Sequence, residues 1–323
     1  MIRYKLNKTD LINKFLVEIE ALKIIFDSQK LLPHIEENFR RESLLKSALY
    51  SARVEGNPSR LNDLDSQEEL HKLEIFNLVR AYKFIFSNRS PKKISVLLTK
   101  RLHKMVMKNI SNQAGSFRTE PWAIFNQAGV AIFLAPAHFK VLGLMADLVN
   151  GIQKLKENEF VKSAVFQFLF EKIHPFPDGN GRVGRLLSSF LLNISGYGFR
   201  GLIPTEEIVD NEREKYYEVL EPSNDVTGFV EFYLESFIKQ AKNVLEKINN
   251  YSGGLSKIDL LPPRRKEIIN IIKDHPYCTF DLIVRRFSKV NQKTLHYDLK
   301  KVVESGFVNK VGKTRGVVYL ANK

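Results

Sequence analysis

Residues 174–185 combine the residue types that bind a polyphosphate, in the sequence HPFPDGNGRVGR. Two prolines near the start of this segment interrupt a helical pattern and predict a loop. Gly179 and Gly181 let the backbone approach a ligand closely, and the consecutive N–H groups at the start of the next helix form an anion-binding nest. The segment therefore predicts a phosphate-binding loop between two helices.

Charged side chains in and after this loop suit the same ligand. Arg182 and Arg185 are three residues apart, so they share a helix face near the nest. Guanidinium groups bind phosphate oxygens, and the carboxylate of Asp178 is a ligand for Mg²⁺. His174 titrates near neutral pH and can remove the proton from a hydroxyl group, which is a poor nucleophile until then. These residues predict attack of a hydroxyl on a bound polyphosphate, with Mg²⁺ and a histidine base.

The whole segment resembles the signature of the Fic family: histidine, proline, phenylalanine, an acidic residue, Gly-Asn-Gly-Arg, two residues, then arginine. The resemblance implies a Mg²⁺- and ATP-dependent protein adenylyltransferase, which moves AMP from ATP onto a hydroxyl side chain of a target protein and releases pyrophosphate. Relatives that transfer a phosphate instead have an altered loop, with a lysine near the second glycine position. Gly181 therefore favours AMP transfer.

The resemblance also implies a role for each residue of the motif. His174 is the expected base, Asp178 is the expected Mg²⁺ ligand, and Phe176 is expected to pack the loop into the core. The nucleotide-binding residues that the resemblance implies are Phe176, Gly179, Asn180, Gly181, Arg182 and Arg185, with Arg185 at the γ-phosphate.

A β-hairpin is predicted upstream of this loop. Residues 122–125 and 130–134 are strand-like, and Asn126, Gln127 and Gly129 lie between them. The segment resembles the flap of the Fic family, which Gly115-Ser116-Phe117-Arg118 would enter and Ala135-Pro136 would leave. We expect the flap, from Trp122 to Leu134, to bind an extended segment of a target protein by strand addition.

A second motif, SARVEGN, occupies residues 51–57. Ser51 and Glu55 are four residues apart and share one helix face, and Gly56 or Asn57 can end that helix. Together with the loop, this motif resembles the inhibitory helix of the Fic family. The resemblance, which covers residues 1–245, implies that Glu55 pairs with Arg185 and inhibits the enzyme.

The C-terminal residues form a separate basic module. Residues 255–323 contain 15 lysines and arginines against 6 acidic residues, most of the net charge of +14. Helices at 263–273, 280–287 and 292–305, followed by strands at 307–311 and 316–320, predict a winged helix. A basic third helix and wing suit a DNA groove, and the candidate contacts are Lys293, Lys300, Lys313 and Arg315. Contacts with protein are the alternative.

The chain as a whole is predicted to be mainly α-helical. We expect an N-terminal helical region with the inhibitory motif at 1–90, a Fic-type catalytic core with its hairpin flap at 91–250, and a winged-helix domain at 255–323. Ser252-Gly253-Gly254 predicts the linker. Helices are expected at 67–87, 95–107, 140–156, 161–173, 181–194, 212–218 and 227–249.

Composition sets wider limits. No apolar run reaches the roughly 18 residues that span a membrane, and the chain starts without the pattern of a secretory signal. Cys278 is the only cysteine, so no intrachain disulfide forms. We therefore expect a cytoplasmic protein. A sequence pI of about 9.6 favours polyanionic partners.

Two other functions compete with AMP transfer. The same site could remove AMP from a modified protein, with Glu55 aligning the water. Alternatively, the protein is a DNA-binding regulator whose Fic core senses nucleotide. The sequence leaves open the target protein, the modified residue, the nucleotide base and the oligomeric state, for which a homo-oligomer is one alternative.

Overall fold

A computed structural model describes residues 3–61, 68–125, 131–221, 223–253, 258, 261–288, 290–312 and 316–322. The chain forms two compact units: residues 1–29 with 39–247, and residues 30–38 with 248–323. The N-terminal helices therefore share one unit with the predicted catalytic core. Among the described residues, no helix is both long and apolar enough to span a bilayer.

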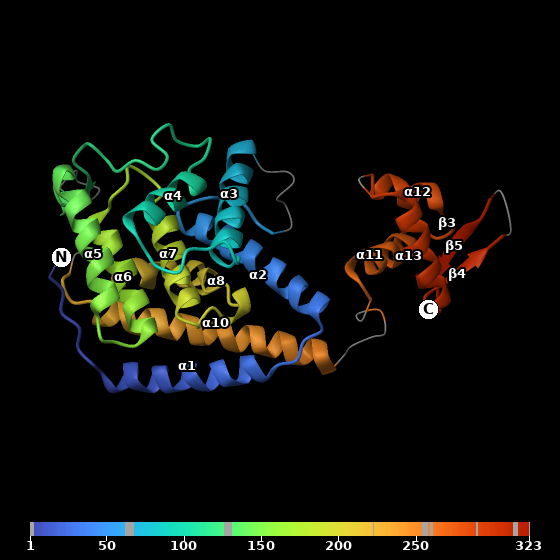
Figure 1. Ribbon diagram of the computed structural model, residues 1–323, viewed down its shortest axis with the longest axis horizontal. Coiled ribbons are helices and arrows are strands. Elements are labelled where there is room, and N and C mark those ends of the chain that lie inside the picture. Colours follow the sequence, from blue (N-terminus) through green and yellow to red (C-terminus); the bar gives the residue numbers. More distant parts are fainter. Residues whose placement is uncertain are drawn as a thin grey trace. The chain divides into compact units, whose positions relative to one another are not determined.

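The first unit is helical, as predicted from the sequence (Figure 1). Its helices are α1 (Asp10–Ser28), most of α2 (Pro33–Val54), α3 (Glu69–Ile85), α4 (Val96–Val106), α5 (Val141–Lys154), α6 (Glu159–Ile173), α7 (Asn180–Ile194), α8 (Glu206–Asn211), α9 (Arg213–Val219) and most of α10 (Thr227–Gly253). Two short 3₁₀ turns, η2 (His138–Lys140) and η3 (Phe199–Gly201), complete the set. Strands β1 (Ala123–Phe125) and β2 (Ala131–Leu134) form an antiparallel hairpin.

Helix α6 is the centre of this unit. Twelve of its fifteen residues are buried, so it is covered on nearly all sides instead of presenting one apolar stripe. It packs most extensively on α7, the next helix in the chain. This pairing positions the loop between the two helices, because both of its ends are anchored in the core.

Two expectations from the sequence differ from the structure in detail. α8 precedes the predicted helix at 212–218 and was not expected. The predicted linker is wrong for Ser252 and Gly253, because α10 continues to Gly253, and a glycine in the last turn costs a helix only about 1 kcal/mol. Gly254 lies outside the described residues.

The second unit contains α11 (Pro263–Asp274), β3 (Cys278–Thr279), α12 (Phe280–Arg286), α13 (Gln292–Glu304), β4 (Val308–Val311) and β5 (Val318–Ala321). The strands form an antiparallel sheet in the order β3-β5-β4. Its own core includes Ile268, Ile272, Leu295, Leu299 and Val302. Three helices and a final hairpin occur in the order that the sequence predicts for a winged helix, and the two-residue β3 is an addition.

Candidate active site

The loop between α6 and α7 has a backbone that few residues adopt. His174 ends α6 in the left-handed region at φ +48°, and Gly179 precedes α7 at φ +78°. A Cβ at Gly179 would lie 2.8 Å from the Sδ atom of Met107, so only glycine fits this position without displacing a neighbour.

Asn180 closes the loop on itself. Its Oδ1 accepts a hydrogen bond from the backbone N–H of Phe176 at 2.9 Å, and its Nδ2 donates to the carbonyl of the same residue at 2.8 Å. Phe176 is completely buried and does not line the cavity. The structure therefore assigns Phe176 to the support of the loop and not to ligand contact.

His103 supports the loop from α4, and the sequence analysis missed it. Its ring stacks on Phe176 with centroids 3.7 Å apart. The N–H of Gly115 donates to Nδ1 at 2.8 Å, so Nε2 carries the proton and donates to the carbonyl of Asp178 at 3.0 Å. Burial lowers the pKa of His103 to about 4. A lone histidine on an apolar helix gave no sequence signal of this role.

The candidate base His174 lies at the wall of a cavity of about 820 Å³. Trp122, at the entrance to the hairpin, stacks on its ring with centroids 3.5 Å apart. Burial lowers the pKa of His174 to about 4, and the positive charge of Arg118 contributes. The imidazole is therefore neutral at pH 7 and able to accept a proton.

Arg118 ties the hairpin to the loop. It is 4% exposed, and its Nε donates to the carbonyl of His174 at 2.7 Å. Its Nη1 donates to the carbonyl of Glu120 at 2.9 Å, and its Nη2 donates to that of Pro136. One side chain thus connects both ends of the hairpin to the residue that carries the base.

The hairpin itself lies at the mouth of the cavity. Ala123 pairs with Leu134, and Ile124 pairs with Phe133. Trp122 and Phe133 line the cavity, whereas the predicted turn at 126–130 lies outside the described residues.

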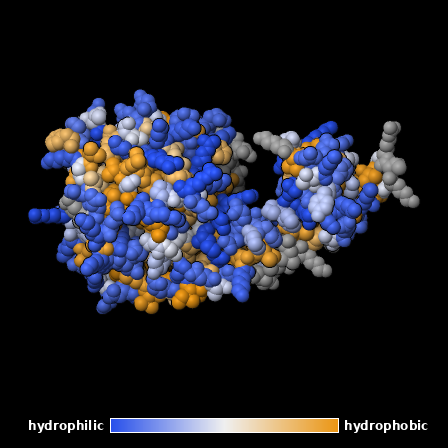
Figure 2. Space-filling view, in the orientation of Figure 1, coloured by the Kyte–Doolittle hydropathy of each residue, from blue (hydrophilic) through white to orange (hydrophobic). Residues whose placement is uncertain are grey.

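Apolar side chains are exposed at the end of the hairpin and just after it in the chain: Leu134, Phe139 and Leu142. Figure 2 shows apolar residues gathered over the region that α5 and α6 occupy in Figure 1.

Arg185 is buried and already paired. Its Nη2 donates to Glu55 Oε1 at 2.8 Å and to the carbonyl of Ser51 at 2.8 Å, while its Nε donates to Ser51 Oγ at 3.1 Å. Glu55 follows the last residue of α2 and lines the cavity, where a Cβ at Gly181 would clash with it. The structure therefore brings Ser51 and Glu55, the predicted inhibitory residues, into contact with Arg185, the residue predicted to bind the γ-phosphate.

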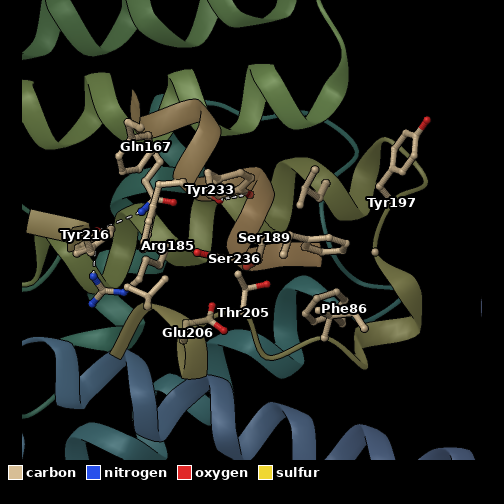
Figure 3. A pocket seen from close by; sticks show the side chains of 18 residues that line it. Phe86, Gln167, Arg185, Ser189, Tyr197, Thr205, Glu206, Tyr216, Tyr233 and Ser236 are labelled. Atoms are coloured by element: carbon tan, nitrogen blue, oxygen red, sulfur yellow. Dashed lines mark hydrogen bonds between the residues drawn. The ribbon is translucent and has the colours of Figure 1, made fainter. Parts of the chain in front are cut away.

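A small second cavity lies behind Arg185 (Figure 3). The hydroxyl of Tyr216 accepts hydrogen bonds from Arg185 Nη1 at 3.3 Å and from Gln167 Nε2 at 3.2 Å. Figure 3 shows Glu206, Tyr233 and Ser236 around the same space. Tyr216 lines both cavities and so connects Arg185 to the main one.

Arg182 is also paired. It bonds the carboxylates of Glu74 on α3 and of Asp178, the latter at 2.8 Å. It is 6% exposed and absent from the cavity wall. In this structure the two Nη groups of Arg182 therefore bind carboxylates.

Asp178 is the carboxylate that suits Mg²⁺. Its side chain is 65% exposed and borders the cavity, and Oδ1 also accepts from the N–H of Gly179 at 2.6 Å. Among the described residues there is no cluster of three metal-ligating side chains. One carboxylate fits Mg²⁺ all the same, because this ion commonly binds one or two carboxylates together with phosphates and water.

The basic residues of the second unit are only partly described. Lys293 and Lys300 are exposed on α13, and Lys300 lies 3.8 Å from Glu304. Lys313 and Arg315 lie outside the described residues.

The fold and the site define a helical protein with a glycine-rich loop at the N-terminus of α7 and a neutral histidine beside it. Residues 93–192 match the model of the Fic/DOC family, so the chain carries a Fic/DOC domain. The structure of a Fic family protein from Desulfovibrio desulfuricans is similar over 99% of this chain and 98% of that one, with a TM-score of 0.71 and 21% identity.

Two curated relatives are similar in sequence. A probable protein adenylyltransferase of Aquifex aeolicus is 31% identical over 163 residues, which is 50% of this chain and 47% of that protein. The protein adenylyltransferase Fic of Drosophila erecta is 27% identical over 234 residues, covering 66% and 43%. The chain thus spans less than half the length of these relatives.

Proposed function

We propose that this protein is a protein adenylyltransferase that transfers AMP from ATP to a hydroxyl side chain of another protein. The observation that carries this proposal is the intact loop HPFPDGNGRVGR with neutral His174 at the wall of a cavity large enough for a nucleotide. The names of the curated relatives support the same activity.

The reaction places the proton on His174. The imidazole removes the proton of the target hydroxyl, whose oxygen attacks the α-phosphorus of ATP. The new O–P bond forms as the bond to the bridging oxygen breaks, and pyrophosphate leaves. The backbone N–H groups at the start of α7, with Gly179 and Gly181, bind the phosphates. Mg²⁺ held by Asp178 would neutralise phosphate charge.

The hairpin supplies the docking edge for the target. A target segment that pairs with it as an added strand would lie beside Trp122 and close to His174. The exposed apolar residues Phe139 and Leu142 would extend this surface.

Glu55 is proposed to inhibit the enzyme. Its carboxylate accepts from Arg185 at 2.8 Å, in the position that the γ-phosphate of ATP would need. A nucleotide that cannot reach Arg185 binds with its α-phosphate out of line, and a displacement of about 1 Å can cost about 100-fold in rate.

Mass spectrometry of a cell lysate treated with the Glu55→Gly variant, ATP and Mg²⁺ tests the activity. We expect AMP adducts on hydroxyl side chains of at least one protein, and none with Glu55→Gly/His174→Ala. A phosphate adduct, or no adduct from the folded Glu55→Gly variant, would contradict the proposal.

Removal of AMP is the second candidate reaction, since Glu55 lines the same cavity as His174. In that reaction Glu55 would align a water molecule for attack on the modified protein. Loss of AMP removal in Glu55→Gly, with no gain of labelling, would favour this alternative.

We also propose that the C-terminal unit binds DNA. Lys293 and Lys300 project from the exposed side of α13, and a basic third helix suits phosphates beside a groove. Lys313 and Arg315 would add contacts from the wing.

A further inference from the structure

Two carboxyl groups lie over neighbouring glycines at the start of α7. Gly181 and Gly184 are three residues apart and therefore share a helix face. A Cβ at Gly181 would clash with Glu55, and a Cβ at Gly184 would clash with Oε1 of Glu171 on α6. The missing side chains leave room for both carboxyl groups beside the phosphate-binding loop.

The two carboxyl groups differ in their partners. Glu55 accepts a hydrogen bond from Arg185. Oε1 of Glu171 is inaccessible to water and has no hydrogen-bond partner in the described part of the chain. Glu171 nevertheless remains partly exposed and borders the main cavity. The carboxyl group therefore has hydrogen-bonding capacity left for a ligand that enters the cavity and meets the part of Glu171 that lines it.

The surroundings of Glu171 favour its neutral form. Burial raises its pKa to about 8, and the negative charge of Glu55 contributes, while Arg185 opposes the shift. The other titratable groups of the cavity wall are His174, Lys172, Asp178, Tyr216, Tyr217, Glu214, Glu218 and Glu221. At neutral pH the Glu171 carboxyl therefore carries a proton and can donate a hydrogen bond, as a carboxylate cannot.

We propose that Glu171 binds the terminal phosphate of ATP by donating a hydrogen bond from its protonated carboxyl. The phosphate would take the place of the Glu55 carboxylate over Gly181, next to Arg185, and Glu171 lies one turn further along the same face of α7. This inference rests on the proposed function, since it assigns a further ligand to the same nucleotide. The phosphate replaces the negative charge of Glu55 and so keeps Glu171 protonated.

Binding of ATP and ADP to folded variants tests this assignment. The parent is Glu55→Gly, in which Arg185 is free of its carboxylate, and the two derivatives add Glu171→Gln or Glu171→Ala. Glutamine keeps a neutral donor of the same size, whereas alanine removes it. Isothermal titration calorimetry is carried out at neutral pH and at about pH 9; in the ATP-bound parent the terminal phosphate stands in for the Glu55 charge that helps to raise the pKa of Glu171.

At neutral pH, we expect the Glu171→Gln variant to bind ATP as tightly as the parent does. We expect the Glu171→Ala variant to bind ATP about 10-fold to 100-fold more weakly, because it loses a hydrogen bond to a charged group. Between neutral pH and about pH 9 the parent should lose about 10-fold in ATP affinity, because ionised Glu171 repels the phosphate. The Glu171→Gln variant should lose much less ATP affinity over the same pH range. ADP, which lacks the terminal phosphate, should bind all three proteins alike.

Titration of Lys172 is the main competing explanation for a pH dependence of ATP affinity, because burial lowers the pKa of Lys172 to about 8. A pH dependence that persists in the Gln variant belongs to Lys172. Equal ATP affinity of parent, Gln and Ala variants at both pH values would overturn the inference. Protein labelling by the Glu55→Gly parent is a separate readout: its absence contradicts the proposed activity, whereas the ATP affinities still decide the role of Glu171.

Discussion

His174 shows how one residue type acquires its function from its surroundings. A histidine in water has a pKa near 6.5 and is partly protonated at neutral pH. Stacking under Trp122 and burial beside Arg118 lower the pKa of His174 to about 4. The same packing thus holds the ring in place and keeps it in the form that can act as a base.

The first prediction concerns the pH dependence of AMP transfer. A base works only when it is unprotonated, so activity falls as the pH drops through its pKa. With the pKa of His174 lowered to about 4, kcat/KM of Glu55→Gly should stay level down to about pH 5, since this quantity reports the free enzyme.

His174→Ala should reduce transfer by about 10²–10⁴-fold and leave ATP binding nearly unchanged.

Initial rates and ATP titrations measure both effects. A fall in kcat/KM already centred near the ordinary histidine pKa would contradict the buried, neutral state of His174. Near-normal transfer by folded His174→Ala would remove it from the mechanism.

The second prediction concerns His103 on α4, which supports the loop between α6 and α7. His103→Phe keeps the ring against Phe176 but removes the hydrogen bonds to Asp178 and Gly115. We expect the free energy of unfolding to fall by about 2 kcal/mol, at about 1 kcal/mol for each hydrogen bond. AMP transfer should fall as well, because the loop loses its position. Chemical denaturation and rate measurements check the two effects, and unchanged values for both would refute the assigned role.

At the scale of elements, the end of α2 meets the start of α7. Arg185 receives Ser51 and Glu55 from one side and Tyr216 on α9 from the other. The pKa of Arg185 stays well above any working pH despite burial, because Tyr216 and Glu55 favour its charge. Displacement of Glu55 therefore leaves a buried, unpaired cation, which is a strong site for a phosphate.

The third prediction follows from this contact. Glu55→Gly should label targets, or itself, much faster than the wild-type protein, because Arg185 becomes free for the γ-phosphate. Ser51→Ala should have a smaller effect, since it removes one uncharged hydrogen bond at 3.1 Å. Arg185→Ala should be inactive and should not be rescued by Glu55→Gly. Labelling with radioactive ATP compares the wild-type protein, the three single variants and the double variant Glu55→Gly/Arg185→Ala.

The comparison between Glu55→Gly and Ser51→Ala separates charge from packing. Equal activation by both would indicate that loosening of the helix end matters and that the carboxylate does not. Labelling by folded Glu55→Gly at the wild-type rate would refute inhibition by Glu55.

At the scale of the whole molecule, the chain joins the unit that holds the candidate active site to a second unit with its own core. The excess positive charge lies mostly in residues 255–323, whereas the candidate active site lies in the other unit. Chemistry and binding to a polyanion are therefore expected to be separable by mutation.

The fourth prediction uses this separation in the full chain. Lys293→Glu/Lys300→Glu should weaken binding to duplex DNA, and the wild-type affinity should fall steeply with added salt because cationic side chains release counterions. AMP transfer by the same variant should be unchanged. Lys273→Glu, at an exposed lysine on α11, is the charge-matched control for each of the single variants Lys293→Glu and Lys300→Glu. Absence of salt-sensitive binding to any duplex tested would favour a protein partner.

The sequence by itself determined the loop between α6 and α7, its candidate base and the helical class of the fold. It could do so because the loop is built from consecutive residues, and because helical periodicity and proline and glycine positions act locally. The hairpin and the order of elements in the second unit followed from the same local rules.

Only the tertiary structure decided which charges meet. The resemblance implied that Glu55 pairs with Arg185, 130 positions away in the chain, but residue spacing gives neither this contact nor that of Arg182 with Glu74, 108 positions away. Neither the role of His103 nor the unpartnered oxygen of Glu171 could be read from spacing. Both depend on burial, which is a property of the packed helices: it lowers the pKa of His103 and raises that of Glu171.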